Sequence, residues 1–103
     1  MTSEYDTRQF ERMLHVLRSY EAGQLGLGRA VADLEALLSC LEGEYEIWKK
    51  SFRRQWAVLE HVYASMLDKG LDVVPSDLQA LIDAAVAALQ RLATEAQTTT
   101  PSP

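Results

Sequence analysis

The sequence contains a single cysteine, Cys40, and two histidines, too few for an internal disulfide or a standard structural zinc site. No apolar run approaches the roughly 18 residues that a membrane span needs, and the first ten residues lack the basic and apolar regions of a signal peptide. With 103 residues, the chain is long enough for one domain with one modest core. These features predict a soluble, cytoplasmic protein without cofactors or membrane contacts.

Basic residues are also scarce, because ten Lys and Arg stand against fifteen Asp and Glu, for a net charge of −5. The segment from Asp33 to Glu46 holds five acids and no base, and residues 60–103 hold six acids and two bases. A phosphate backbone would be repelled by such a surface, whereas a basic protein would be attracted to it. The charge therefore predicts a basic protein partner and no nucleic acid.

No catalytic pattern is present. His15 and His61 fall on the outward faces of helical stretches, and neither has the Glu three residues earlier that di-iron bundles use. The glycines between Gly23 and Gly28 do not form a dinucleotide fingerprint, because Val31 stands where the third glycine belongs. We therefore predict that the protein is not an enzyme.

What the sequence does contain is helical periodicity, most clearly from Glu44 to Lys69. This stretch carries five of the eight aromatic residues on one apolar stripe, which predicts a long central helix with Trp48, Phe52 and Trp56 in the core. Three shorter amphipathic segments flank it. The prediction is an all-α, antiparallel four-helix bundle with helices near 4–22, 27–42, 44–69 and 77–96, forming one domain over 1–96, with a disordered C-terminal tail at 97–103.

Several single residues carry narrower expectations. Ser3 or Asp6 is expected to cap the first helix, while Gly23 and Gly70 end the first and third helices. Cys40, at the edge of the second helix's apolar seam, is expected to be a small buried hydrophobe. Further along, Gln55 projects into the apolar arc of the third helix, where a buried amide needs a hydrogen-bond partner. Ile47 and Val58 lie on the polar side of that helix, where exposed apolar side chains indicate a surface that contacts another molecule.

The string Trp48-x3-Phe52-x3-Trp56-x2-Leu59-Glu60-x2-Tyr63-Ala64, followed by Asp68-x-Gly70, resembles small bacterial helical proteins. In size, acidity and layout the chain is similar to bacterial immunity proteins, which neutralise cationic nuclease toxins by covering them with an acidic face. The Tyr-Tyr-Pro signature of the DNase-colicin immunity proteins is missing, since the connection before the last helix reads Val73-Val74-Pro75. The resemblance implies an immunity- or antitoxin-like role and transfers no binding residue.

The predicted function is thus a non-enzymatic protein-binding module, of the immunity or antitoxin type, that neutralises a basic, nuclease-type toxin. The alternative is a homo-oligomeric or scaffolding domain, such as a homodimer, paired through the seam of the second helix or the line of Ile47 and Val58. Complementary charge would steer the partner, and apolar anchors would supply affinity. The predicted partner-binding residues are Glu35, Glu42, Glu44, Asp68, Asp72 and Asp77 for steering, with Val73 and Val74 as anchors. The alternative is that these acids serve only helix starts and solubility.

Overall fold

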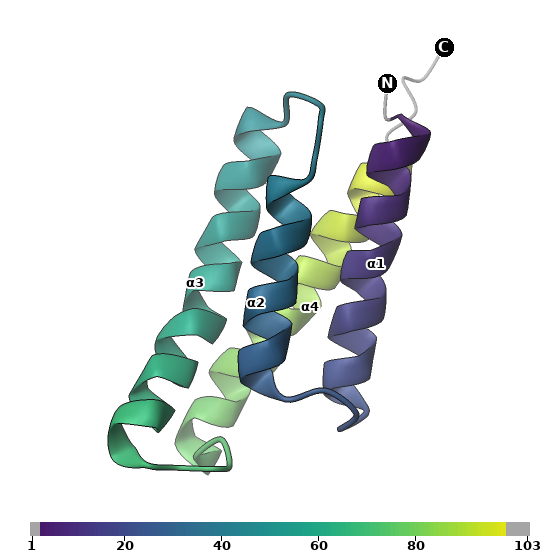
Figure 1. The fold of residues 1–103 in the computed structure, drawn as a ribbon. Helices are drawn as coiled ribbons and strands as arrows, with labels where there is room; N and C mark the ends of the chain where they lie inside the picture. The colour runs from purple at the N-terminus through teal and green to yellow at the C-terminus, as the bar shows by residue number, and fades with distance from the viewer. Residues whose placement is uncertain (1–2, 99–103) are drawn as a thin grey trace.

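The computed structural model describes residues 3–98 and shows four helices that run alternately up and down (Figure 1). They are α1 (Glu4–Glu21), α2 (Leu27–Ser39), α3 (Glu46–Lys69) and α4 (Ser76–Thr98). Each helix packs against two others, α1 on α2 and α4, and α3 on α2 and α4. The described residues contain no strand. The predicted all-α, antiparallel four-helix bundle is confirmed.

Three of the predicted helix boundaries differ from the structure by two or three residues, and the others agree within one. Helix α2 ends at Ser39 and α3 begins only at Glu46, so the connection between them is longer than expected. Helix α4 continues to Thr98 and takes the first two residues of the predicted tail. The rest of that tail, 99–103, lies outside the described residues.

The core is formed by the apolar stripes that the helical periodicity predicts. Its largest fully buried side chains come from all four helices: Phe10, Met13, Leu17, Leu34, Phe52, Leu59, Ile82 and Leu89. Phe52 is buried as predicted, whereas Trp48 and Trp56 are only half-buried. Both indoles lie at the edge of the core, where each N–H donates to a backbone carbonyl of a neighbouring helix, at 2.9 Å. Half-burial suits tryptophan because its ring is apolar and its N–H is polar.

The glycines predicted to end α1 and α3 do so. Gly23 and Gly70 have φ of +76° and +65°, the left-handed region that favours glycine. At the end of α3, the backbone N–H of Leu71 donates to the carbonyl of Met66 at 2.9 Å, which is the long hydrogen bond of a Schellman motif. The corresponding hydrogen bond at the end of α1 runs from the backbone N–H of Gln24 to the carbonyl of Ser19, at 2.9 Å. Both helices therefore end sharply, at the same end of the bundle.

Cys40 and Gln55 were predicted to have buried side chains, and both predictions are wrong. Cys40 is exposed, because α2 ends one residue earlier and Cys40 caps it outside the apolar seam. Gln55 is half-exposed, because α4 presents the small Ala88 opposite it and leaves a groove of about 290 Å³ that reaches solvent. Of the expected surface pair, Ile47 is 83% exposed, but Val58 is half-buried and packs against the core.

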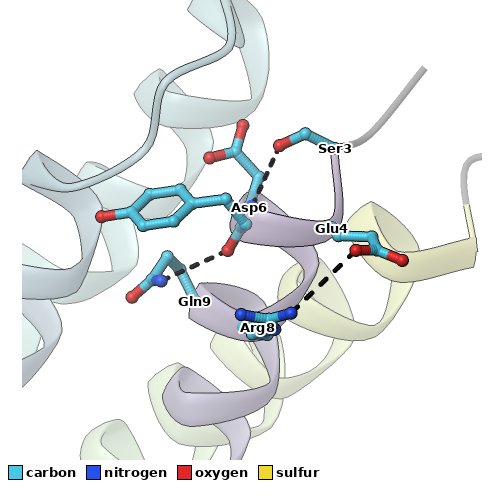
Figure 2. A network of polar contacts seen from close by, with 6 residues as sticks. Ser3, Glu4, Asp6, Arg8 and Gln9 are labelled. Atoms are coloured by element: carbon cyan, nitrogen blue, oxygen red, sulfur yellow. Dashed lines mark hydrogen bonds and ion pairs between the residues drawn. The ribbon is translucent and has the colours of Figure 1, made fainter.

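The connection between α2 and α3 is held to α1 by a buried carboxylate. Asp6 is only 1% exposed, and its two oxygens accept hydrogen bonds from the N–H of Glu42 (2.9 Å), the N–H of Gly43 (3.0 Å) and the hydroxyl of Tyr45 (2.7 Å). The helix cap is a different residue, since Ser3 Oγ accepts from the Asp6 N–H at 3.1 Å (Figure 2). Of the two residues considered as caps from the sequence, Ser3 fills the role and Asp6 instead joins distant parts of the chain.

Burial by itself would raise the pKa of Asp6, because it disfavours the charged form. The hydrogen bonds from Glu42, Tyr45 and Gly43, together with the positive charge of Lys49, outweigh burial and leave the pKa of Asp6 below its usual value. The folded protein therefore favours the ionised carboxylate. Its contribution to stability is present above about pH 4, the usual pKa of an unfolded Asp, and is lost as the pH falls through the lowered pKa.

We predict that Asp6→Asn lowers the free energy of unfolding at pH 7 by about 2–4 kcal/mol, because three buried donors lose a charged acceptor. Urea unfolding at pH 7 and pH 3 measures this effect. The difference between parent and variant should shrink at the lower pH, where protonation removes the same charge from the parent. Glu4→Gln is the control, because it removes an exposed acid from the same turn and should change stability little. A loss that is small at pH 7, or equal at both pH values, would contradict this role for Asp6.

Candidate functional site: an acid-rimmed pocket at one end of the bundle

The predicted partner-binding acids do not form one surface. Because the helices are antiparallel, the connection 40–45 lies beside the start of α1, and the connection 70–75 lies at the opposite end (Figure 1). The 24 residues of α3 separate these ends by about 36 Å, at 1.5 Å per residue. Glu42 and Glu44 belong to the first end, and the exposed Glu35 lies in the last turns of α2, which run toward it.

The second end contains a pocket with a volume of about 700 Å³. The α1–α2 turn, the end of α3, the connection 70–75 and the first turns of α4 surround it. Its apolar lining includes the buried Met66 and Val86 and the half-buried Tyr63. Two further lining residues remain open to solvent, Leu67 at 62% and Leu71 at 40% exposure. The pocket thus combines an apolar floor with exposed apolar side chains at its mouth.

Three acids, Glu21, Asp72 and Asp83, line the pocket, and no Lys, Arg or His does. Over residues 3–98, the ion pairs are Glu4–Arg8 and Arg29–Asp33, so none of the three pocket acids forms an ion pair within this part of the chain. Glu21 also borders a neighbouring groove that Arg18 and Arg91 line. They come from α1, from the connection 70–75 and from α4. Three carboxylates without counter-ions make this end of the bundle attractive to cations.

Hydrogen bonds from neutral glutamine side chains position two of these acids and leave their negative charge in place. Glu21 Oε1 accepts from Gln90 Nε2 at 2.7 Å, and Asp83 Oδ1 accepts from Gln79 Nε2 at 2.9 Å. Burial raises the pKa of the neighbouring Tyr20 phenol, and the negative charge of Asp83 raises it further. Tyr20 therefore stays protonated at neutral pH and can donate or accept a hydrogen bond at the pocket wall.

Of the predicted residues at this end, the structure brings Asp72 and the half-buried Val74 to the pocket. Asp68 and Asp77 are exposed but do not line it, and Val73, at 77% exposure, points away from the core. Sequence reasoning missed two of the acids and most of the apolar lining: Glu21, Asp83, Tyr20, Tyr63, Leu67 and Leu71. The available signal was weak, and consisted of two Leu-Asp pairs at 67–68 and 71–72 on either side of Gly70.

The pocket wall depends on a close approach between α2 and α3. A Cβ at Gly28, in the first turn of α2, would overlap the ring of Tyr63. Glycine at this position therefore lets the Tyr63 ring lie directly against the α2 backbone. Gly26, two residues earlier, has open space around it.

Candidate metal ligands are scattered over the described part of the chain. Within residues 3–98, His, Cys, Asp and Glu side chains do not gather in groups of three that could hold a metal ion. Both histidines are exposed. The helices of this part of the chain include none with the length and apolar character that crossing a membrane requires.

Comparison with protein families, with curated proteins and with solved structures finds no match.

The contact between Gly28 and Tyr63 can be tested with a double-mutant cycle. In the parent, Gly28→Ala should leave stability unchanged or lower it by up to about 2 kcal/mol, because the displaced ring offsets the better helix propensity of alanine. In a Tyr63→Ala background, the same change should stabilise the protein by up to about 1 kcal/mol, since the obstacle is gone. Urea unfolding of the four proteins measures the coupling.

Gly26→Ala is the matched control, because its effect should be the same in both backgrounds. If Gly28→Ala also behaves identically with and without the Tyr63 ring, the two residues do not form this wall of the pocket.

Proposed function

We propose that this protein is a non-enzymatic binding module that holds a basic protein partner against the pocket end of the bundle. The observation that carries the proposal is the set of three carboxylates, Glu21, Asp72 and Asp83, that line an apolar pocket without any basic lining residue and form no ion pair within the described residues. Acids that served only solubility would not need an apolar pocket between them.

The two components of the surface have different physical effects. Unpaired carboxylates accelerate the encounter with a basic surface and disfavour acidic competitors, and each exposed charge adds only about 0.2–1 kcal/mol of affinity. Affinity comes from burying apolar surface, at roughly 25 cal/mol per Å² before the costs of association. Exposed Leu67 and Leu71 supply such surface beside the acids. A partner that carries both positive charge and apolar side chains would satisfy both components.

An immunity- or antitoxin-like role is the form of this function that we favour. Such a protein works by covering its target, and a small acidic bundle suits the covering of a basic nuclease-type toxin. This part of the proposal rests on the class resemblance in size, acidity and helical layout.

The alternative, a homo-oligomeric or scaffolding module, has less support on the described surface. The seam of α2 that would pair with a second copy is buried within the bundle, with Leu34 and Leu38 at 0% and 3% exposure. Val58 is half-buried as well, which leaves Ile47 as the one exposed member of the expected contact line. A homodimer would have to use a different surface.

The test is co-purification from the native cell at low and moderate salt. We expect a basic partner that is retained at about 50 mM salt and released at about 500 mM, because salt screens exposed charges. The double variant Asp72→Asn/Asp83→Asn should weaken binding of that partner about tenfold at low salt, which corresponds to about 1.4 kcal/mol. If the partner is a toxic nuclease, adding the purified parent protein should inhibit its nuclease activity.

Glu35→Gln/Glu44→Gln is the matched control, because it removes the same charge from residues outside the pocket. It should retain the partner as well as the parent does. An equal loss with both double variants would show that only net charge matters. The proposal would be wrong in that case, and also if no basic partner is retained at either salt concentration.

A further inference from the structure

The exposed apolar residues of the protein are not evenly spread. Ile47 on α3 and Leu81 on α4 are exposed singly and line none of the described pockets. Leu67 and Leu71, by contrast, are both exposed and both line the acid-rimmed pocket, together with the half-buried Val74. Scattered exposed leucines are normal on soluble proteins, but neighbouring ones beside an apolar hollow mark a surface that can be covered.

The charges around this hollow restrict what can cover it. Three carboxylates in the lining would repel a nucleic acid and an anionic lipid surface. A neutral small molecule would leave the carboxylates without counter-ions, and the solvent-exposed leucines would not enclose it. A peptide segment with apolar residues on one side and basic residues on the other matches both the floor and the rim.

We infer that the pocket binds a cationic amphipathic segment of the partner, with one or two apolar side chains inserted between Tyr63 and Leu71 and flanking Lys or Arg residues facing Asp72, Glu21 and Asp83. This inference rests on the proposed function and deepens it by naming what the partner presents. The acids come from three separate elements, so basic residues on both sides of the inserted side chain find a carboxylate. The inserted side chain covers Leu67 and Leu71. These two leucines, in place of the predicted Val73, then act as apolar anchors of this chain.

The probe is a synthetic amphipathic helical peptide of about 14 residues, with leucines on one face and Lys and Arg on the other. Two matched peptides separate the contributions. One replaces the leucines by serine and keeps the charge, and the other replaces Lys and Arg by glutamine and keeps the leucines. Fluorescence anisotropy at about 50 mM salt should show the full peptide binding at least about tenfold tighter than either.

Variants of the protein locate the binding. Leu67→Ser/Leu71→Ser should weaken binding of the full peptide about tenfold, while Ile47→Ser, an equally apolar and more exposed position at the other end of α3, should leave it unchanged. The mutated side chains are substantially exposed, so thermal unfolding should confirm that the variants remain folded. In the parent, methyl resonances of Leu67, Leu71 and Val74 should shift on addition of the full peptide, and those of Ile47 should not.

Two results would overturn the inference. If the charge-only peptide binds as tightly as the full one, attraction is purely electrostatic and the pocket takes no apolar side chain. If Ile47→Ser weakens binding as much as Leu67→Ser/Leu71→Ser does, the peptide does not occupy this pocket. Neither result would contradict the proposed function. That proposal is contradicted by a different result, namely that retention of the native partner does not depend on Asp72 and Asp83.

Discussion

The buried carboxylate of Asp6 is the interaction on which the arrangement of the bundle depends. It joins the first turn of α1 to the connection before α3 through three hydrogen bonds, and a buried charge is tolerated only when it is satisfied in this way. By fixing Tyr45, it sets where α3 begins. Tyr45 and Trp48 then pack edge-on against Phe10 of α1, with ring centroids 5.6 and 5.1 Å apart.

Fixing the start of α3 also positions its far end. Because the helix is a rigid rod of about 36 Å, its register at Tyr45 decides where Tyr63, Leu67 and Gly70 lie relative to α2 and α4, the two helices against which α3 packs. The two ends of the bundle therefore have different roles. At the Asp6 end, the buried carboxylate accepts hydrogen bonds from backbone N–H groups and a hydroxyl of this same chain. At the pocket end, the acids Asp72 and Asp83 are left without counter-ions, and in our proposal the partner supplies them.

The sequence predicted those features that depend on neighbours along the chain. Helical periodicity indicated four helices and most of the core, and Gly23 and Gly70 marked two helix ends correctly because a left-handed cap is a local requirement. Asp6 looked like a cap for the same reason. Its actual partners are 36 to 39 residues away, and no local pattern indicates them.

The candidate site was predictable only in part. Asp72 was found from its place in an acidic connection, but Glu21 and Asp83 reach the same pocket only because antiparallel packing brings the ends of α1 and α3 beside the start of α4. Acid-rich segments of the sequence were grouped by their distance along the chain, and the fold instead separates Glu42 and Glu44 from Asp72 by most of the length of α3. Cys40 was misplaced because α2 ends one residue before it.

The central claim is that partner binding belongs to the pocket end alone. Hydrogen–deuterium exchange of the protein, free and bound to the partner retained at low salt, tests it most directly. Our account predicts slower exchange on binding in segments 21–28 and 67–83, with no change in 40–46, which the partner does not contact. Protection confined to 40–46, or spread equally over both ends, would contradict it.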